Sequence, residues 1–316
     1  TGTSWVPMIG ITINSDATFI AQQDFNANQQ LGTTNGITVV NHTGRLIFQS
    51  MTNNTTYNEH ITLNSTRTEG GLWLDQAEVV LNGPITLGTN TIINTRMANN
   101  LHRDATISGT IDDGAGNYNL VLIGQNTGQQ STNYLERSRL FLTGSNTYGG
   151  DTYITLRNEN STSLNVSNQS MIVVLSNGNQ RLPAGTTVYL GGVAPGMNNG
   201  NSLANGRLVL AGVTQQLAGL QTLGIGSSNA VVGGAPRMSL LNLNIGFLQT
   251  NIYGGLLGGP NPMENNLMLQ KSGLGLLVLT NNNNSYTAGP TLPTVCSCLA
   301  IRATAAASCY ASPWTR

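Results

Sequence analysis

Residues 139–154 read RLFLTGSNTYGGDTYI, and residues 271–289 read KSGLGLLVLTNNNNSYTAG. Each stretch has a short run of alternating apolar residues, a polar turn rich in Asn, a Tyr and a corner that contains Gly. Alternation with a period of two predicts a β-strand with one buried face, and Asn and Gly favour the turns that end such strands. Similar short runs recur from Ile37–Val40 to Leu276–Thr280, so the sequence predicts many short strands along most of the chain.

The composition favours strands over helices. The 316 residues include 40 Asn, 38 Thr and 38 Gly but a single lysine, Lys271, and only 8% of the residues are charged. Asn, Thr and Gly are unfavourable in helix interiors, whereas Thr suits strands and Asn and Gly suit turns. We therefore expect an all-β protein.

The charges argue against two classes of partner. The 13 basic and 13 acidic residues cancel, and no basic run occurs, so nothing in the sequence attracts nucleic acid or an anionic membrane. No stretch reaches the 18 or so consecutive apolar residues of a membrane-spanning helix. Residues 1–5, TGTSW, contain neither Met nor the start of a signal peptide, which indicates a processed or excised product.

The strand pattern favours a solenoid over a sandwich or a propeller. A sandwich should show recurrent two-residue hairpin turns, and a propeller should show an aromatic signature in each blade, yet aromatic residues make up only 5% of the chain. Stacked turns of chain need small residues at corners and Asn side chains that can hydrogen-bond from one turn to the next. We expect one such domain over residues 1–292, with about 20 to 25 residues in each turn of the solenoid.

Five segments carry a resemblance to a known family. They are residues 139–154 and 271–289, together with RLPAGTTVYLGG (181–192), GRLVLAGVTQQLAGL (206–220) and ISGTIDDG (107–114). These segments resemble the autotransporter-associated β-strand repeat of large bacterial surface proteins. The resemblance is good over about residues 104–290, whereas residues 1–103 share only the general character of the repeat. It implies a right-handed parallel β-helix (β-solenoid) in a secreted or surface-displayed region.

The pattern changes after Gly289. Residues 293–316 contain no Gly and no Asn, and they hold all three cysteines, Cys296, Cys298 and Cys309. This segment is expected either to cap the last turn or to be a non-native continuation, and not to add a regular turn. Three cysteines without a second pair or a neighbouring histidine predict neither a disulfide framework nor a zinc site.

Acidic residues are the main candidates for chemistry. Parallel β-helices host polysaccharide lyases and hydrolases that use clustered carboxylates, and the available acids here are Asp104 beside Arg103, the pair Asp112 and Asp113, and Asp151. The Asp112–Asp113 pair precedes Gly114, which favours ordinary turn chemistry over catalysis. Asp112, Asp113 and Asn117 offer oxygens to a single calcium ion at most.

Other motifs favour structural roles. Lys271 follows Gln270 and so lacks the phosphate-loop context; it is interpreted as the basic residue before a strand. Gly224–Asn229 approximates a dinucleotide fingerprint without the third Gly, and a turn is favoured there. His42, His60 and His102 have no recognisable nucleophile partner. We assign no catalytic, cofactor-binding or metal-binding residue and expect no cofactor.

The sequence thus favours a non-catalytic, extracellular β-solenoid that serves as a surface scaffold, adhesin shaft or matrix filament subunit. The alternative is a carbohydrate-binding or polysaccharide-degrading β-helix, and a phage or other fibre protein ranks third. The expected partners are further copies of the chain, end to end or side by side, and glycans or host cell-surface ligands. Aliphatic columns are expected to include Leu140, Leu142, Leu208, Leu210, Leu277 and Leu279.

Overall fold

The computed structural model describes residues 10–22, 31, 36–49, 54–75, 77–96, 104–126, 139–158, 170–291 and 298–301. The regular secondary structure of these residues is β-strand, apart from one 3-10 turn, η4 (Pro262–Asn265). The expected all-β class is confirmed.

The strands of the described residues form five sheets. The first sheet, in spatial order, contains β1 (Gly10–Ile13), β3 (Ile37–His42), β6 (His60–Ser65), β9 (Ile85–Leu87) and β12 (Ile111–Asp112). The second contains β2 (Thr18–Gln22), β4 (Arg45–Gln49), β7 (Leu72–Asp75), β10 (Thr91–Arg96), β13 (Leu120–Asn126), β15 (Thr152–Asn158), β17 (Thr187–Leu190) and β20 (Gly219–Thr222). The third contains β5 (Thr55–Tyr57), β8 (Val79–Leu81), β11 (Ala105–Ile107), β14 (Arg139–Leu142), β16 (Ser170–Leu175), β18 (Asn205–Leu210), β21 (Ala230–Val232) and β24 (Leu256–Leu257). The fourth contains β19 (Thr214–Leu217), β22 (Ser239–Asn244), β25 (Leu267–Ser272) and β27 (Ala288–Thr291), and the fifth contains β23 (Thr250–Tyr253), β26 (Leu276–Leu279) and β28 (Cys298–Ile301).

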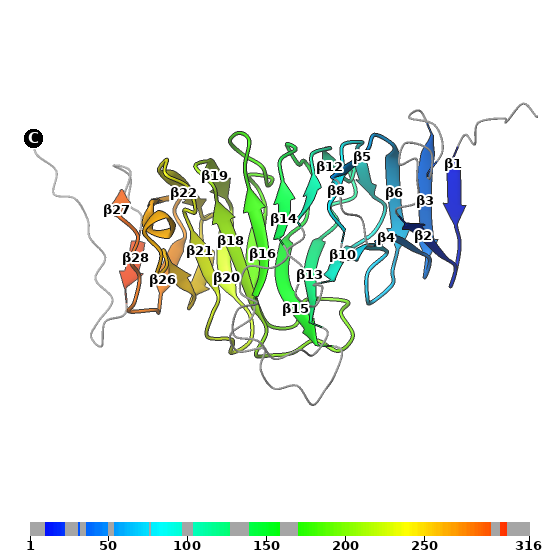
Figure 1. Ribbon diagram of the computed structural model, residues 1–316. Coiled ribbons are helices and arrows are strands. Elements are labelled where there is room, and N and C mark those ends of the chain that lie inside the picture. The colour runs from blue at the N-terminus through cyan, green and yellow to red at the C-terminus, as the bar shows by residue number, and fades with distance from the viewer. Residues whose placement is uncertain are drawn as a thin grey trace, which may run out of the picture.

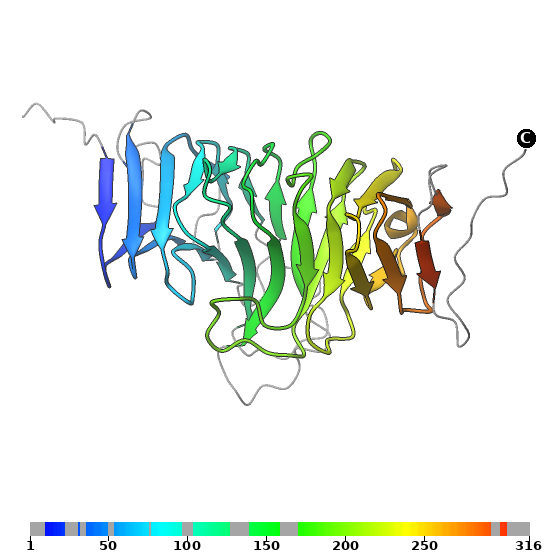
Figure 2. The ribbon, with the colours of Figure 1, turned by 180° about the vertical axis from the view of Figure 1, so that it is seen from behind.

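The chain visits the sheets in rotation. Consecutive strands such as β3, β4 and β5 belong to the first, second and third sheets, and β6, β7 and β8 then pair with them in parallel. We call one such course of the chain a pass. Passes add in chain order along an elongated stack, from β1 at one end to β27 and β28 at the other (Figure 1). The reverse view shows the same order of strands (Figure 2). This parallel arrangement is compatible with a β-helix.

Passes differ in length. The offset between paired residues runs from 20 residues, between Met268 and Ala288, to 36 residues, between Thr152 and Val188. The expected 20 to 25 residues are therefore too few for the middle of the chain, because the corners there carry longer connections. The connection at 191–204, between β17 and β18, is one example, and its Ala194 packs against Ile92, Val121 and Ile123 in a second hydrophobic cluster.

The core consists of columns of aliphatic side chains that run from pass to pass. In the third sheet, Leu81, Ile107, Leu142, Leu175 and Leu210 follow one another in register, and all are at most 1% exposed. The neighbouring column passes from Ala105 through Leu140, Val173, Leu208 and Val231 to Leu257. Parallel pairing without offset places like residues one above another, so each column buries a continuous apolar strip.

The predicted stacking of aliphatic side chains is found for four of the six leucines, and the other two have different neighbours on the preceding strand. Leu140, Leu142, Leu208 and Leu210 stack as expected. Leu277 and Leu279 are buried too, but their register partners on β23 are Asn251 and Tyr253, which are not aliphatic. Tyr253 O–H donates to the Leu256 carbonyl, which satisfies its polar atom inside the core.

Amide side chains form ladders at the corners. Asn64 Nδ2 donates to Asn41 Oδ1 (2.9 Å), and Asn41 Nδ2 donates to Asn14 Oδ1 (3.2 Å). Asn82 Nδ2 likewise donates to Asn58 Oδ1 (2.7 Å). The high Asn content therefore supplies side-chain hydrogen bonds between passes, as the sequence predicted, at and just beyond the ends of the strands.

Buried amides also connect the first sheet to the fourth. Two passes between β12 and β19 have no strand at this side of the stack, among the residues described. There the backbone N–H of Ile111 donates to Asn146 Oδ1 (2.8 Å), and Asn146 Nδ2 donates to the Arg181 carbonyl (2.7 Å). The next step is made by Gln215, which accepts from Leu182 N–H and donates to the Leu182 carbonyl (3.0 Å each). Side chains thus add to the few backbone hydrogen bonds between these passes, such as the one from Thr147 N–H to the Ile111 carbonyl (2.9 Å).

Only part of the 293–316 segment is described. Residues 298–301 form β28, which pairs in parallel with β26 from Leu276↔Cys298 to Leu279↔Ile301. For these four residues the chain continues the fifth sheet in regular register. Cys296 and Cys309 lie outside the described residues, and the expectation for the rest of the segment stays a prediction.

Candidate functional site

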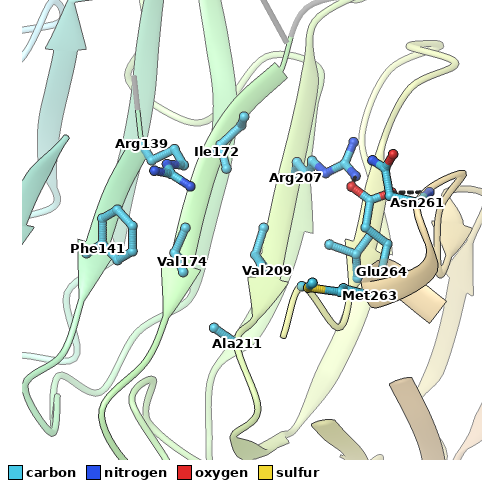
Figure 3. Close-up of a pocket in the computed structure, with 12 residues that line it drawn as sticks. Arg139, Phe141, Ile172, Val174, Arg207, Val209, Ala211, Asn261, Met263 and Glu264 are labelled. Atoms are coloured by element: carbon cyan, nitrogen blue, oxygen red, sulfur yellow. Dashed lines mark hydrogen bonds and ion pairs between the residues drawn. The ribbon is translucent and has the colours of Figure 1, made fainter. Parts of the chain in front are cut away.

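A groove of about 430 Å³ lies on the outer face of the third sheet. Its floor is a row of side chains that pair across β14, β16, β18 and β21, namely Phe141, Val174, Val209 and Val232. These residues alternate along their strands with the core columns, so they point to the opposite face. Figure 3 shows Phe141, Val174 and Val209 of this row together with Ala211 and Met263.

Two arginines border the groove. Arg139 and Arg207 flank Ile172 in the row next to the floor. Arg139 makes a two-pronged contact with Asp104, Nε to Oδ1 at 3.1 Å and Nη2 to Oδ2 at 2.7 Å. Arg207 donates through Nη2 to Glu264 Oε1. Both guanidiniums are therefore held in fixed positions at the rim.

The far wall is η4, and local hydrogen bonds hold it in place. Asn261 precedes the turn, and its N–H donates to Glu264 Oε2 (3.3 Å). The N–H groups of Gly233 and Gly234 donate to the carbonyls of Glu264 and Met263, each at 2.9 Å. This anchoring leaves Met263 52% exposed at the rim. An apolar floor with polar groups fixed at its edge suits the apolar face and hydroxyl groups of a sugar ring.

The acids singled out in the sequence do not converge. Asp104 pairs with Arg139 at the third sheet. Asp113 is 7% exposed and accepts the backbone N–H of Tyr118 (2.7 Å) and of Gly149 (3.0 Å) through one oxygen. Asp151 Oδ1 accepts the N–H of Thr187 (3.0 Å). Each of these carboxylates stabilises a corner of the chain or the rim of the groove. Arg103 lies outside the described residues.

Asp112 belongs to a polar row on the first sheet that the sequence did not reveal. Thr86 Oγ1 lies 2.9 Å from His60 Nε2 and 3.4 Å from Asp112 Oδ2. The hydroxyl sits between the imidazole and the carboxylate, whereas nucleophilic catalysis needs the imidazole between the other two groups. The contact joins β6, β9 and β12 across their outer face.

Three arginines gather around one glutamate on the outer side of the second sheet. Arg45 is the first residue of β4, Arg157 lies in β15, and Arg67 and Glu69 belong to the connection between β6 and β7. Glu69 contacts Arg45 Nη2 (2.6 Å), Arg157 Nη2 (3.2 Å) and Arg67 Nε (3.5 Å). The guanidinium carbon of Arg45 also lies 4.0 Å from the ring centre of Trp73. We call these four charged residues the arginine cluster.

The charges of the arginine cluster shift the pKa values of two of its own members. Burial raises the pKa of Glu69, but the attraction of Arg157, Arg45 and Arg67 outweighs it and holds that pKa below its ordinary value. Burial, together with repulsion from Arg67, lowers the pKa of Arg45. The sequence could not predict this group, because Glu69 and Arg157 are 88 residues apart and only the stacking of passes brings them together.

Lys271 lies inside the protein. It forms part of β25 instead of preceding a strand, it is 0% exposed, and its Nζ donates to the carbonyls of Ser272 (2.7 Å) and Gly273 (2.9 Å). Gly273 has a φ of +72°, so the chain turns sharply there and presents these carbonyls to the amine. The lysine therefore closes the corner after β25.

The remaining motifs form no site. Residues 224–229 make the turn between β20 and β21, and Asn229 Oδ1 accepts the N–H of Gly206 (2.8 Å). His42 lies at the end of β3, and His102 falls outside the described residues. Across the described ranges, no three His, Cys, Asp or Glu side chains gather as a group that could hold a metal ion.

No protein family, no curated protein and no solved structure matches this chain. In the part of the chain that the structure describes, none of the helical segments has the length and apolar character needed to cross a membrane.

Proposed function

We propose that the chain is a right-handed parallel β-helix of an extracellular bacterial surface protein, and that it serves as a non-catalytic scaffold, adhesin shaft or filament subunit. The observation that carries the proposal is the rotation of strands among parallel sheets, with aliphatic columns that continue from pass to pass. Such a stack keeps its cross-section while its length grows with the number of passes. The resemblance of residues 104–290 to the autotransporter-associated repeat supports the same function.

The acids support a structural role. Asp104 is paired with Arg139, and Asp113 and Asp151 accept backbone N–H groups at corners. A glycoside hydrolase instead needs two carboxyl groups that face one another across a space for substrate.

A reducing-end assay on a panel of acidic and neutral polysaccharides separates scaffold from enzyme. The wild-type protein should release no new reducing ends, and the variant Asp112→Asn should behave identically. Release of reducing ends that Asp112→Asn abolishes would overturn the non-catalytic proposal.

Self-association is the partner interaction that the fold favours. The terminal strands β1 and β28 have an edge with no further strand of the described residues beyond it, and open edges invite pairing with another chain. Light scattering over increasing protein concentration should show growing particles, and electron microscopy should show rods. A monomer at every concentration would contradict this part of the proposal.

The groove on the third sheet favours a second function, carbohydrate binding. The apolar floor around Phe141 and the fixed guanidiniums of Arg139 and Arg207 are the supporting features. Binding to an oligosaccharide array should be lost in Phe141→Ala and retained in Ile252→Ala, a change at a half-exposed residue of β23. Equal binding by both variants would remove the groove from consideration.

A further inference from the structure

Within the arginine cluster, positive charge exceeds negative charge. Arg45, Arg67 and Arg157 carry three positive charges, and Glu69 supplies one negative charge. The side chains of Arg157 and Arg45 are only 5% and 12% exposed, so water screens their mutual repulsion poorly. Keeping like charges together at low exposure is unfavourable unless further negative charge joins them.

The cluster also has more hydrogen-bond donors than acceptors. Each guanidinium offers five N–H donors. Within the described residues, Arg45 and Arg157 each donate to one oxygen of Glu69, and Arg67 Nη1 donates to the Thr43 carbonyl (2.8 Å). The Nε atoms of all three arginines are buried and have no hydrogen-bond partner among the residues that the structure describes.

We propose that the arginine cluster binds an oxoanion, such as a sulfate group, which accepts these spare N–H donors beside Glu69. The side chains of Glu69 and Arg67 are 33% and 26% exposed, so the anion can approach from their side. Guanidinium groups bind planar and tetrahedral oxoanions through paired N–H donors, which fits the chemistry of this site. The anion is either a free ion or a sulfate ester of a glycan, and its binding does not depend on the scaffold function.

Isothermal titration of the full chain with sodium sulfate, at ionic strength held constant with sodium chloride, tests the proposal. The wild-type protein should show saturable binding, and Arg67→Gln should weaken it at least tenfold. Arg237→Gln is the matched control, because it removes the same charge from an exposed residue outside the cluster. An equal effect of Arg67→Gln and Arg237→Gln would overturn the proposal, because general charge attraction would then account for binding.

Glu69→Gln distinguishes a binding site from a purely structural ion-pair network. Removing the competing carboxylate raises the net charge of the cluster from +2 to +3, so sulfate affinity should increase at least threefold. A network whose only role is to join strands binds neither sulfate nor dextran sulfate, in the wild-type protein or in Glu69→Gln, and that result would refute the proposal.

Dextran sulfate and neutral dextran identify the source of the anion. Binding of inorganic sulfate supports a free-ion site, and binding of dextran sulfate alone, again weakened by Arg67→Gln, supports a sulfated glycan. Binding of neither probe, or equal binding of dextran and dextran sulfate, overturns the proposal.

Discussion

Leu142 offers the most direct test of the stacked core. Its side chain is 0% exposed and lies in register between Ile107 and Leu175. Replacing it with Ala removes three carbon atoms, worth about 2.4 kcal/mol at about 0.8 kcal/mol each. The paired strands hold their spacing of about 4.8 Å, so the site cannot collapse. A residual cavity of about 60 Å³ then adds about 1.5 kcal/mol, and we expect Leu142→Ala to lose about 4 kcal/mol of unfolding free energy.

Urea denaturation followed by far-UV circular dichroism measures this loss. Leu274→Ala is the matched control, because Leu274 is 52% exposed in the turn between β25 and β26 and should lose only about 1 kcal/mol. Leu142→Met, which nearly conserves volume, should lose less than about 1.5 kcal/mol. If Leu142→Ala proves no less stable than Leu274→Ala, the aliphatic column that contains Leu142 does not contribute the expected share of the unfolding free energy.

Four further predictions concern buried polar groups. Asn146→Ala leaves the Ile111 N–H without its buried side-chain partner, while the Arg181 carbonyl keeps its hydrogen bond from the backbone N–H of residue 146 (3.3 Å), so the change should cost about 1 to 3 kcal/mol in the same denaturation assay; an unchanged unfolding free energy would contradict the bridging role. Burial raises the pKa of Glu59, which is 4% exposed, so the folded protein should lose stability as pH rises above about 4.3, where the unfolded chain ionises; Glu59→Gln keeps an acceptor for Thr38 and should lack that loss. Burial raises the pKa of Tyr57 to about 12, so the protein should lose stability between about pH 10 and 12. Tyr57→Phe should lose less stability in alkaline melting curves, and an equal loss in the variant and the wild-type protein would contradict the role of Tyr57. Lys271 should resist amine acylation in the native protein and react after denaturation, as mass spectrometry of its peptide can show; rapid native labelling would place the amine at the surface.

The periodic part of the fold could be predicted from the sequence. Alternation in residues 139–142 and 207–210 identified the buried leucines, because a strand with one buried face imposes a period of two on its residue types. Residues 170–175, SMIVVL, break the rule, since every side chain of β16 is buried. Their apolar run reflects a strand whose outer-face side chains Ile172 and Val174 are buried as well, where they line the groove.

The sites could not be predicted in the same way. The groove depends on the position of η4 against the third sheet, which hydrogen bonds from Gly233 and Gly234 determine. The arginine cluster depends on the offset between passes, and that offset varies along the chain. Lys271 has the residue type of a surface position and the burial of a core position, because carbonyls at a sharp turn provide acceptors for its amine. Such tertiary arrangements leave no periodic signal.

The variation in pass length has a mechanical consequence. Hydrogen bonds between strands run along the long dimension of the stack, and the first and last described strands lie at opposite ends of it (Figure 1). A force that pulls the two ends apart should therefore peel the chain from an end, one pass at a time. Passes of 20 to 36 residues release about 70 to 125 Å of extended chain each. Unequal extension steps, longest when the middle of the stack unravels, would then record the order of the passes in a single stretching trace.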